Sequence, residues 1–118
     1  MKDNPLFYKS FQFAIKIVGV HKSMLQKKRE YIFSKQLIKC GTSIGANVAE
    51  ANGAISKSDF SAKISIAYKE SLEVKYWLKL LRDTEYLSVR DAESLINEAD
   101  ELSKIMFAIL KTTRIKKN

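Results

Sequence analysis

The chain has 118 residues, 46% of them hydrophobic and 29% charged, and its formal net charge is +8. This length and composition exclude a disordered chain and predict one domain, residues 1–118, around a single hydrophobic core. No apolar run reaches the roughly 18 residues that span a bilayer, and the first residues lack a signal-peptide apolar core, so we expect a cytoplasmic protein with no membrane partner.

The first helix is predicted over about residues 5–23. Asn4 is a favoured N-cap residue, and Pro5 suits the first helical position. Apolar residues at helical spacing form two neighbouring rows, Phe7, Phe11, Ala14 and Val18 in one and Leu6, Phe13, Ile17 and Val20 in the other. This apolar face is wider than one bundle core requires.

The second helix is predicted over about residues 29–53, after a polar turn at residues 26–28. Its apolar row contains Leu37, Gly41, Ile44, Val48, Ala51 and Ile55. Gly41 and Gly45 each cost about 1 kcal/mol in helix propensity relative to Ala, so we expect a neighbouring helix to approach closely there. Gly53 is expected to end the helix in the left-handed conformation.

Two serine caps predict the remaining helices, over about residues 57–84 and 89–113. Ser56 and Asp59 have capping-box spacing, with Ile55 and Phe60 at the hydrophobic staple positions, and Ser88 and Asp91 repeat the cap. The third helix carries the row Phe60, Ile64, Ala67, Ser71, Val74, Leu78 and Leu81. The fourth carries Ala92, Leu95, Ala99, Leu102, Met106 and Ile109 at the same spacing.

Four amphipathic helices joined by short turns predict an all-α fold, an antiparallel up-down-up-down four-helix bundle. The chain has more large apolar residues than one small bundle can hide, notably Tyr8, Phe13, Ile66, Tyr76, Trp77 and Phe107. We interpret them as an oligomer interface, and the alternative is that they line the edge of a monomer core.

Polar residues form a line beside the small residues of the second helix. Ser43, Asn47 and Glu50 lie on one side of it, and Ser71 interrupts the apolar row of the third helix. We expect these four residues to form a buried polar network that fixes the register of the two helices, because a slip would leave a buried group unpaired. The alternative is a ligand or catalytic site around Glu50.

The sequence offers little for catalysis, and we expect no enzyme activity, no metal and no cofactor. His21 is the only histidine, so the paired Glu-x-x-His motifs of metal-binding bundles are absent. Glu50, Glu70 and Glu73 could gather without a histidine, and Cys40 fits a small packing residue. The glycines between Cys40 and Gly53 lack the Gly-Lys-Ser/Thr of a phosphate-binding loop.

Basic residues are unevenly distributed along the chain. Residues 1–49 hold nine basic and two acidic residues, and residues 102–118 hold five basic and none acidic. This asymmetry favours an anionic partner, with nucleic acid ahead of a membrane surface, over a merely solvated face. The predicted phosphate contacts are Lys9, Lys16, Lys28, Arg29, Lys35, Lys39, Lys111, Arg114, Lys116 and Lys117, with the lysines of the first two helices side by side.

The chain resembles the four-helix bundle proteins encoded in 23S rRNA intervening sequences. The resemblance rests on Gln36-Leu37, Ser43-Ile44, Asn47-Val48 with Glu50, Ile66-Ala67 and Ser71-Leu72-Glu73. The chain departs from the family pattern at Ala51, where Gly is usual, and at Lys27-Lys28, where Pro is common. A looser resemblance is to the accessory protein of diversity-generating retroelements.

The family resemblance implies a ring-like homo-oligomer, a homopentamer, without established catalytic activity. Together with the charge, it favours a non-enzymatic bundle that binds nucleic acid, RNA ahead of DNA, without strong sequence specificity. Two alternatives stay open: an oligomeric scaffold for a protein partner, and a ligand-binding protein or enzyme that uses Glu50 and Glu73.

Overall fold

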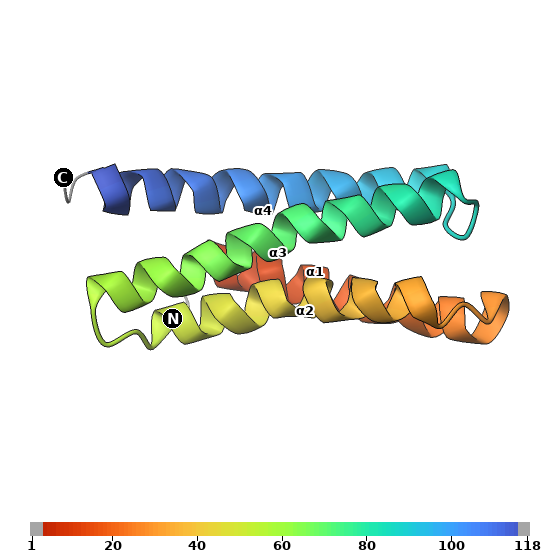
Figure 1. Cartoon of the computed structure of the whole chain (residues 1–118), viewed down its shortest axis with the longest axis horizontal. Coiled ribbons are helices and arrows are strands. Elements are labelled where there is room, and N and C mark those ends of the chain that lie inside the picture. The colour runs from red at the N-terminus through yellow and green to blue at the C-terminus, as the bar shows by residue number, and fades with distance from the viewer. Residues whose placement is uncertain (1–3, 116–118) are drawn as a thin grey trace.

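Four antiparallel α-helices make up the computed structural model, which describes residues 4–115 and the side chains up to Thr113 (Figure 1). They are α1 (Pro5–Ser23), α2 (Ile32–Asn52), α3 (Lys57–Asp83) and α4 (Val89–Ile115), and a short π-helix, η1 (Met24–Lys28), extends α1. Each helix packs against the next, and α1 touches α4 more lightly, in a bundle 48 Å long. The predicted fold class is confirmed.

Three side-chain caps start helices where the sequence predicts them. The Asn4 side-chain oxygen accepts a hydrogen bond from the Phe7 N–H at 2.9 Å. The hydroxyl of Ser56 accepts from the Asp59 N–H at 3.0 Å, and that of Ser88 from the Asp91 N–H at 3.1 Å. Each bond satisfies an N–H that has no partner within its own helix, so these sequence signals set the starts of α1, α3 and α4.

The core forms from one of the two predicted rows of α1 and from the rows of the other three helices, with two corrections. On α3 and α4 the buried residues include Ile64, Val74, Leu102 and Met106, all almost completely shielded from solvent. Phe13, expected at the surface, is fully buried, because the row of α1 that contains it faces the core. Conversely, Ile55 is 94% exposed, because α2 ends at Asn52 and Ile55 lies in the turn that follows.

The small residues of α2 allow α1 to approach closely, as predicted. A Cβ atom at Gly41 would lie 2.8 Å from Cγ2 of Ile17, and one at Gly45 would lie 3.4 Å from the Ser10 carbonyl oxygen. The expectation for Gly53 is wrong. Its φ is −102°, so it follows the helix without the left-handed conformation.

Candidate nucleic-acid interface

The connection between α1 and α2 lies at one end of the bundle and is fixed by its own backbone. η1 ends at Lys28. The next residue, Arg29, has a left-handed φ of 52°, and the N–H groups of Arg29 and Glu30 both donate to the Met24 carbonyl. Residues 26–28, expected as a turn, are therefore helical. α2 begins at Ile32 instead of Arg29, because a residue with positive φ cannot continue a right-handed helix.

Glu30 turns the one acidic side chain of this connection inward. Its carboxylate accepts hydrogen bonds from the N–H groups of Ile32, Phe33 and Ser34, at 3.1, 3.2 and 2.8 Å. Glu30 is buried, and its negative charge lies at the N-terminus of α2, where the helix dipole favours it. The outer surface of the connection therefore presents cations.

We call five exposed residues around this connection the basic end of the molecule. They are Lys22, Lys27, Lys28, Arg29 and Lys35. Among the side chains that the structure describes, none of these five takes part in an ion pair. Their charges are thus available to an anion in solution.

Lys9 and Lys16, unlike these five cations, are held in ion pairs. Lys9 forms an ion pair with Glu101 and Lys16 with Glu98, each at 2.8 Å, and both acids belong to α4. The lysines of the first two helices, expected side by side, come together at Lys16 and Lys28, which line one cavity, while both Lys9 and Lys16 reach toward α4. Their positive charge is largely offset by these carboxylates.

Lys39 lies one turn along α2 from Lys35 and faces acids of α3. Burial and the charge of Glu73 raise the pKa of Glu70, and Lys39 acts against this rise. Because Lys39 interacts with Glu70, it offers less free charge to a phosphate than Lys35 does. The predicted phosphate contacts Lys28, Arg29 and Lys35 are therefore grouped, with Lys39 at their margin.

The last described turns of α4, with Lys111, lie at the opposite end of the bundle (Figure 1). Lys111 is exposed there. The side chain of Arg114, and Lys116 and Lys117 entirely, lie outside the described residues. The basic end and Lys111 lie toward opposite ends of a bundle 48 Å long, so they are separate regions of positive charge.

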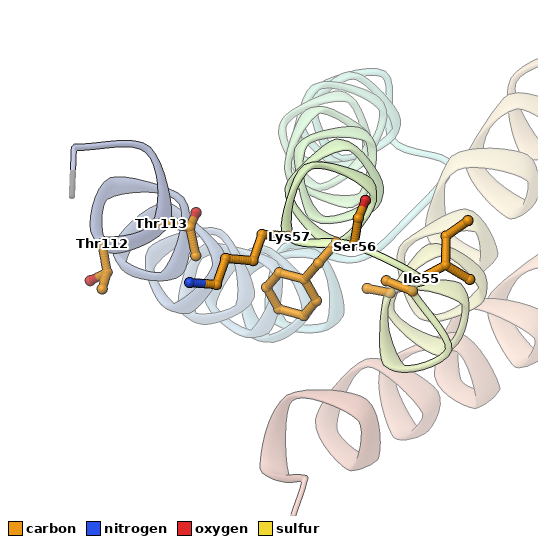
Figure 2. A pocket seen from close by; sticks show the side chains of 8 residues that line it. Ile55, Ser56, Lys57, Thr112 and Thr113 are labelled. Carbon is orange, nitrogen blue, oxygen red and sulfur yellow. The ribbon is translucent and has the colours of Figure 1, made fainter. Parts of the chain in front are cut away.

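A cavity of about 520 Å³ opens at this second end, between the α2–α3 turn and the last turns of α4. Figure 2 shows Ile55, Ser56 and Lys57 on one side of it and Thr112 and Thr113 on the other. Thr113 accepts a hydrogen bond from the Ser61 hydroxyl at 3.2 Å, which ties α4 to α3 beside the cavity. Its charged lining residue is Lys57, and its aromatic one is Phe60.

The predicted polar network between α2 and α3 is not formed in the described residues. Ser71 bonds to Ser103 of α4 at 2.7 Å, and the Asn47 amide donates to the Ser43 carbonyl of its own helix. Glu50 is exposed and pairs with Lys63 at 2.8 Å. The four residues separate because Ser71 faces the α3–α4 contact and Glu50 faces solvent.

The acids beside Cys40 provide no metal site. Burial, with the charges of Glu73 and Glu70, raises the pKa of the Cys40 thiol to about 12, as expected for a packing residue and not for a nucleophile. Glu73 accepts a hydrogen bond from the Trp77 ring N–H at 3.1 Å. In the described part of the chain, His, Cys, Asp and Glu side chains do not gather in threes that could hold a metal ion.

Sequence reasoning missed two cations of the basic end, Lys22 and Lys27, and two aromatic residues near it, Tyr31 and Tyr86. Lys27 is adjacent in the sequence to the predicted contact Lys28, so counting every basic residue of the connection would have included Lys27. Tyr86 follows α3, and only the fold brings it to this end. No sequence spacing could have found it.

The fold and the charge distribution define a class, a small basic four-helix bundle whose described residues hold no metal cluster. The chain belongs to the 23S rRNA-intervening sequence protein family, whose model matches residues 2–108. It is also similar to a crystal structure of a protein of unknown function from the S23 ribosomal protein family of Bacteroides thetaiotaomicron. The two are 42% identical, with a TM-score of 0.88, over 90% of this chain and 98% of that one. No curated protein matches the chain.

Within residues 4–115, none of the helices combines the length and apolar character that crossing a bilayer requires.

Proposed function

We propose that this protein is a non-enzymatic, self-associating bundle that binds nucleic acid, RNA ahead of DNA, through its basic end. The observation that carries the proposal is the group of five exposed cations without ion pairs, around a connection whose one acid is buried. Phosphates are the anions that such a surface meets along a nucleic acid. The mention of 23S rRNA in the family name is a reason to test RNA first. The cytoplasmic location expected from the sequence is part of this proposal.

Charge accounts for affinity here and not for sequence reading. Lysine and arginine side chains on a helix end contact phosphates whatever the base, and the described residues contain no zinc site that would place a reading helix in a groove. We therefore expect similar affinities for RNAs of different sequence. The basic end can also bind DNA, because its affinity depends on the phosphates more than on the sugar.

The test is the affinity for a labelled RNA, measured by fluorescence anisotropy at about 50 and 200 mM salt. If all five cations contact phosphates of a single strand, binding weakens about a hundredfold between these concentrations. A salt-independent affinity would show that charge does not drive binding. Absence of binding at the lower salt concentration would refute the proposed function itself.

Self-association has its own support, on the outer face of α1. Tyr8, Phe11 and Ile15 recur at spacings of three and four residues and are each at least half exposed. The Phe7 and Phe11 rings stack at 5.9 Å, which joins the row into one apolar surface. We propose that this surface lies between copies of the chain, in the homopentamer that the sequence resemblance implies. Light scattering after gel filtration tests this: Phe11→Ser should reduce the mass, and an already monomeric parent protein would contradict it.

A protein scaffold is the second candidate, favoured by a groove between α3 and α4. The groove has a volume of about 450 Å³ and includes Tyr68, Leu72 and Lys75. Exposed apolar side chains, Leu72 and Phe107, lie in it beside the charged Lys75, and aromatic and apolar groups next to charges are found at protein interfaces. A stoichiometric protein that co-purifies without nucleic acid, and is lost in Leu72→Ser, would favour this candidate.

A further inference from the structure

A second cavity lies at the basic end itself, where the α3–α4 turn meets the end of α1. It has a volume of about 350 Å³ and is lined by residues from both sides, including Val20, Lys28, Tyr86 and Leu87. Figure 1 shows the two connections at the same end of the bundle. A cavity of this volume falls within the range of small-ligand sites, and one nucleobase fits such a space.

The walls of this cavity combine an aromatic ring with apolar side chains. Tyr86 is 37% exposed, so part of its ring is open to a ligand. Val20 and Leu87 are half-buried, and Gly19, which lines the cavity without a side chain, leaves room above them. Flat aromatic and apolar surfaces favour a stacked base, because every nucleobase has a π face.

Tyr86 is held in place before any ligand arrives. Glu85 has a φ of 66°, and the N–H groups of Tyr86 and Leu87 both donate to the Leu81 carbonyl, at 2.9 and 3.1 Å. This closed turn fixes the backbone of Tyr86 across from Lys28. Because the backbone that carries the ring is already ordered, stacking has to order only the Tyr86 side chain.

The charges around the cavity favour a phosphate outside it and a neutral base inside. Lys28 lines the cavity without an ion pair, whereas Lys16 already pairs with Glu98. Asp91 is the acid in the lining, so the interior does not suit a phosphate. Tyr31, 58% exposed and two residues after Arg29, offers a second aromatic surface along the same connection.

We propose that the basic end binds single-stranded nucleic acid, with one base stacked on Tyr86 in this cavity and the neighbouring phosphates on Lys28 and Arg29. A duplex keeps its bases stacked on one another and offers this end only its backbone, so it gains nothing from Tyr86. This inference rests on the proposed function and names its substrate class.

The experiment compares anisotropy titrations of three probes of one mixed sequence, about 12 nucleotides long: single-stranded RNA, single-stranded DNA and the RNA duplex. Both single strands should bind at least tenfold more tightly than the duplex. Tyr86→Leu should weaken single-strand binding about tenfold and leave duplex binding unchanged, whereas Tyr86→Phe, which keeps the ring, should bind nearly as the parent does.

Phe107→Leu is the matched control, because it removes an exposed ring from α4, outside the proposed binding surface. It should leave all three affinities unchanged. Thermal melts establish that each variant folds. If Tyr86→Leu does not fold, Tyr31→Leu takes its place and is expected to weaken single-strand binding several-fold. Equal affinity for strand and duplex, or unaltered binding in a folded Tyr86→Leu, overturns this inference while the proposed function stands. If none of the probes binds, both fall.

Discussion

At the scale of single residues, Gly41 sets the distance between α1 and α2. Ile17 lies where a Gly41 Cβ would be, and Ile17 is fully buried and branched at Cβ, so it has little room to move. Gly19, by contrast, has no atom within 4 Å of the position that a Cβ would take, and it sits on the exposed side of α1. The two glycines therefore have opposite tolerances for a methyl group.

We predict that Gly41→Ala lowers stability by about 1 kcal/mol, because overpacking outweighs the gain in helix propensity of about 1 kcal/mol. Gly19→Ala should raise stability by up to about 1 kcal/mol, since it gains the propensity alone. Urea unfolding followed by circular dichroism measures both. If Gly41→Ala is the more stable of the two, the close contact of α1 with α2 is contradicted.

Ser71 and Glu50, which the sequence predicts in one buried network, contribute differently to stability. Ser71 is buried and pairs with Ser103, whereas Glu50 is exposed and makes one surface ion pair. Ser71→Ala should cost about 1 kcal/mol of unfolding free energy, and Glu50→Ala less than about 0.5 kcal/mol. Thermal melts decide between the accounts. A larger loss of unfolding free energy for Glu50→Ala than for Ser71→Ala would favour the predicted network between α2 and α3.

At the scale of the elements, the α1–α2 connection depends on Glu30. Its carboxylate accepts hydrogen bonds from three backbone N–H groups at the start of α2. We predict that Glu30→Ala costs about 1–2 kcal/mol, because the cap and its charge near the helix N-terminus are both lost. Glu30→Gln, which keeps an oxygen acceptor, should cost less. Equal losses in chemical denaturation would mean that the oxygen acceptor contributes nothing.

The sequence predicts the starts of three helices closely, and it predicts α2 least well. Asn4, Ser56 and Ser88 are caps that act within a few residues, so local spacing reveals them. η1 and the Glu30 cap depend on how the chain turns back against α1, and this choice is made by tertiary contacts. The rows on α3 and α4 are predictable for the same local reason as the caps.

The candidate site is less predictable than the fold. Lys28, Arg29 and Lys35 could be chosen from the sequence, but so could Lys9 and Lys16, which differ only in having acids of α4 beside them. Which lysines form ion pairs depends on which helices are neighbours and on how those helices are aligned along the bundle axis. Tyr86 enters the site for the same reason, from more than fifty residues away in the chain.

At the scale of the whole molecule, a group of five unpaired cations lies at one end of an elongated bundle, and paired charge lies along its α1–α4 face. Net charge alone predicts that any two lysines contribute equally to binding. The structure predicts that they do not. This difference separates a defined interface from general attraction between a basic protein and a polyanion.

The most direct test is the salt dependence of RNA affinity in two double variants that remove the same charge. Lys28→Gln with Lys35→Gln should make the slope of log affinity against log salt shallower by about 1.4, the value for two lost phosphate contacts with a single strand. Lys9→Gln with Lys63→Gln, at lysines that pair with Glu101 and Glu50 away from the basic end, should leave the slope nearly unchanged. Equal slopes in the two double variants would contradict a binding surface at the basic end.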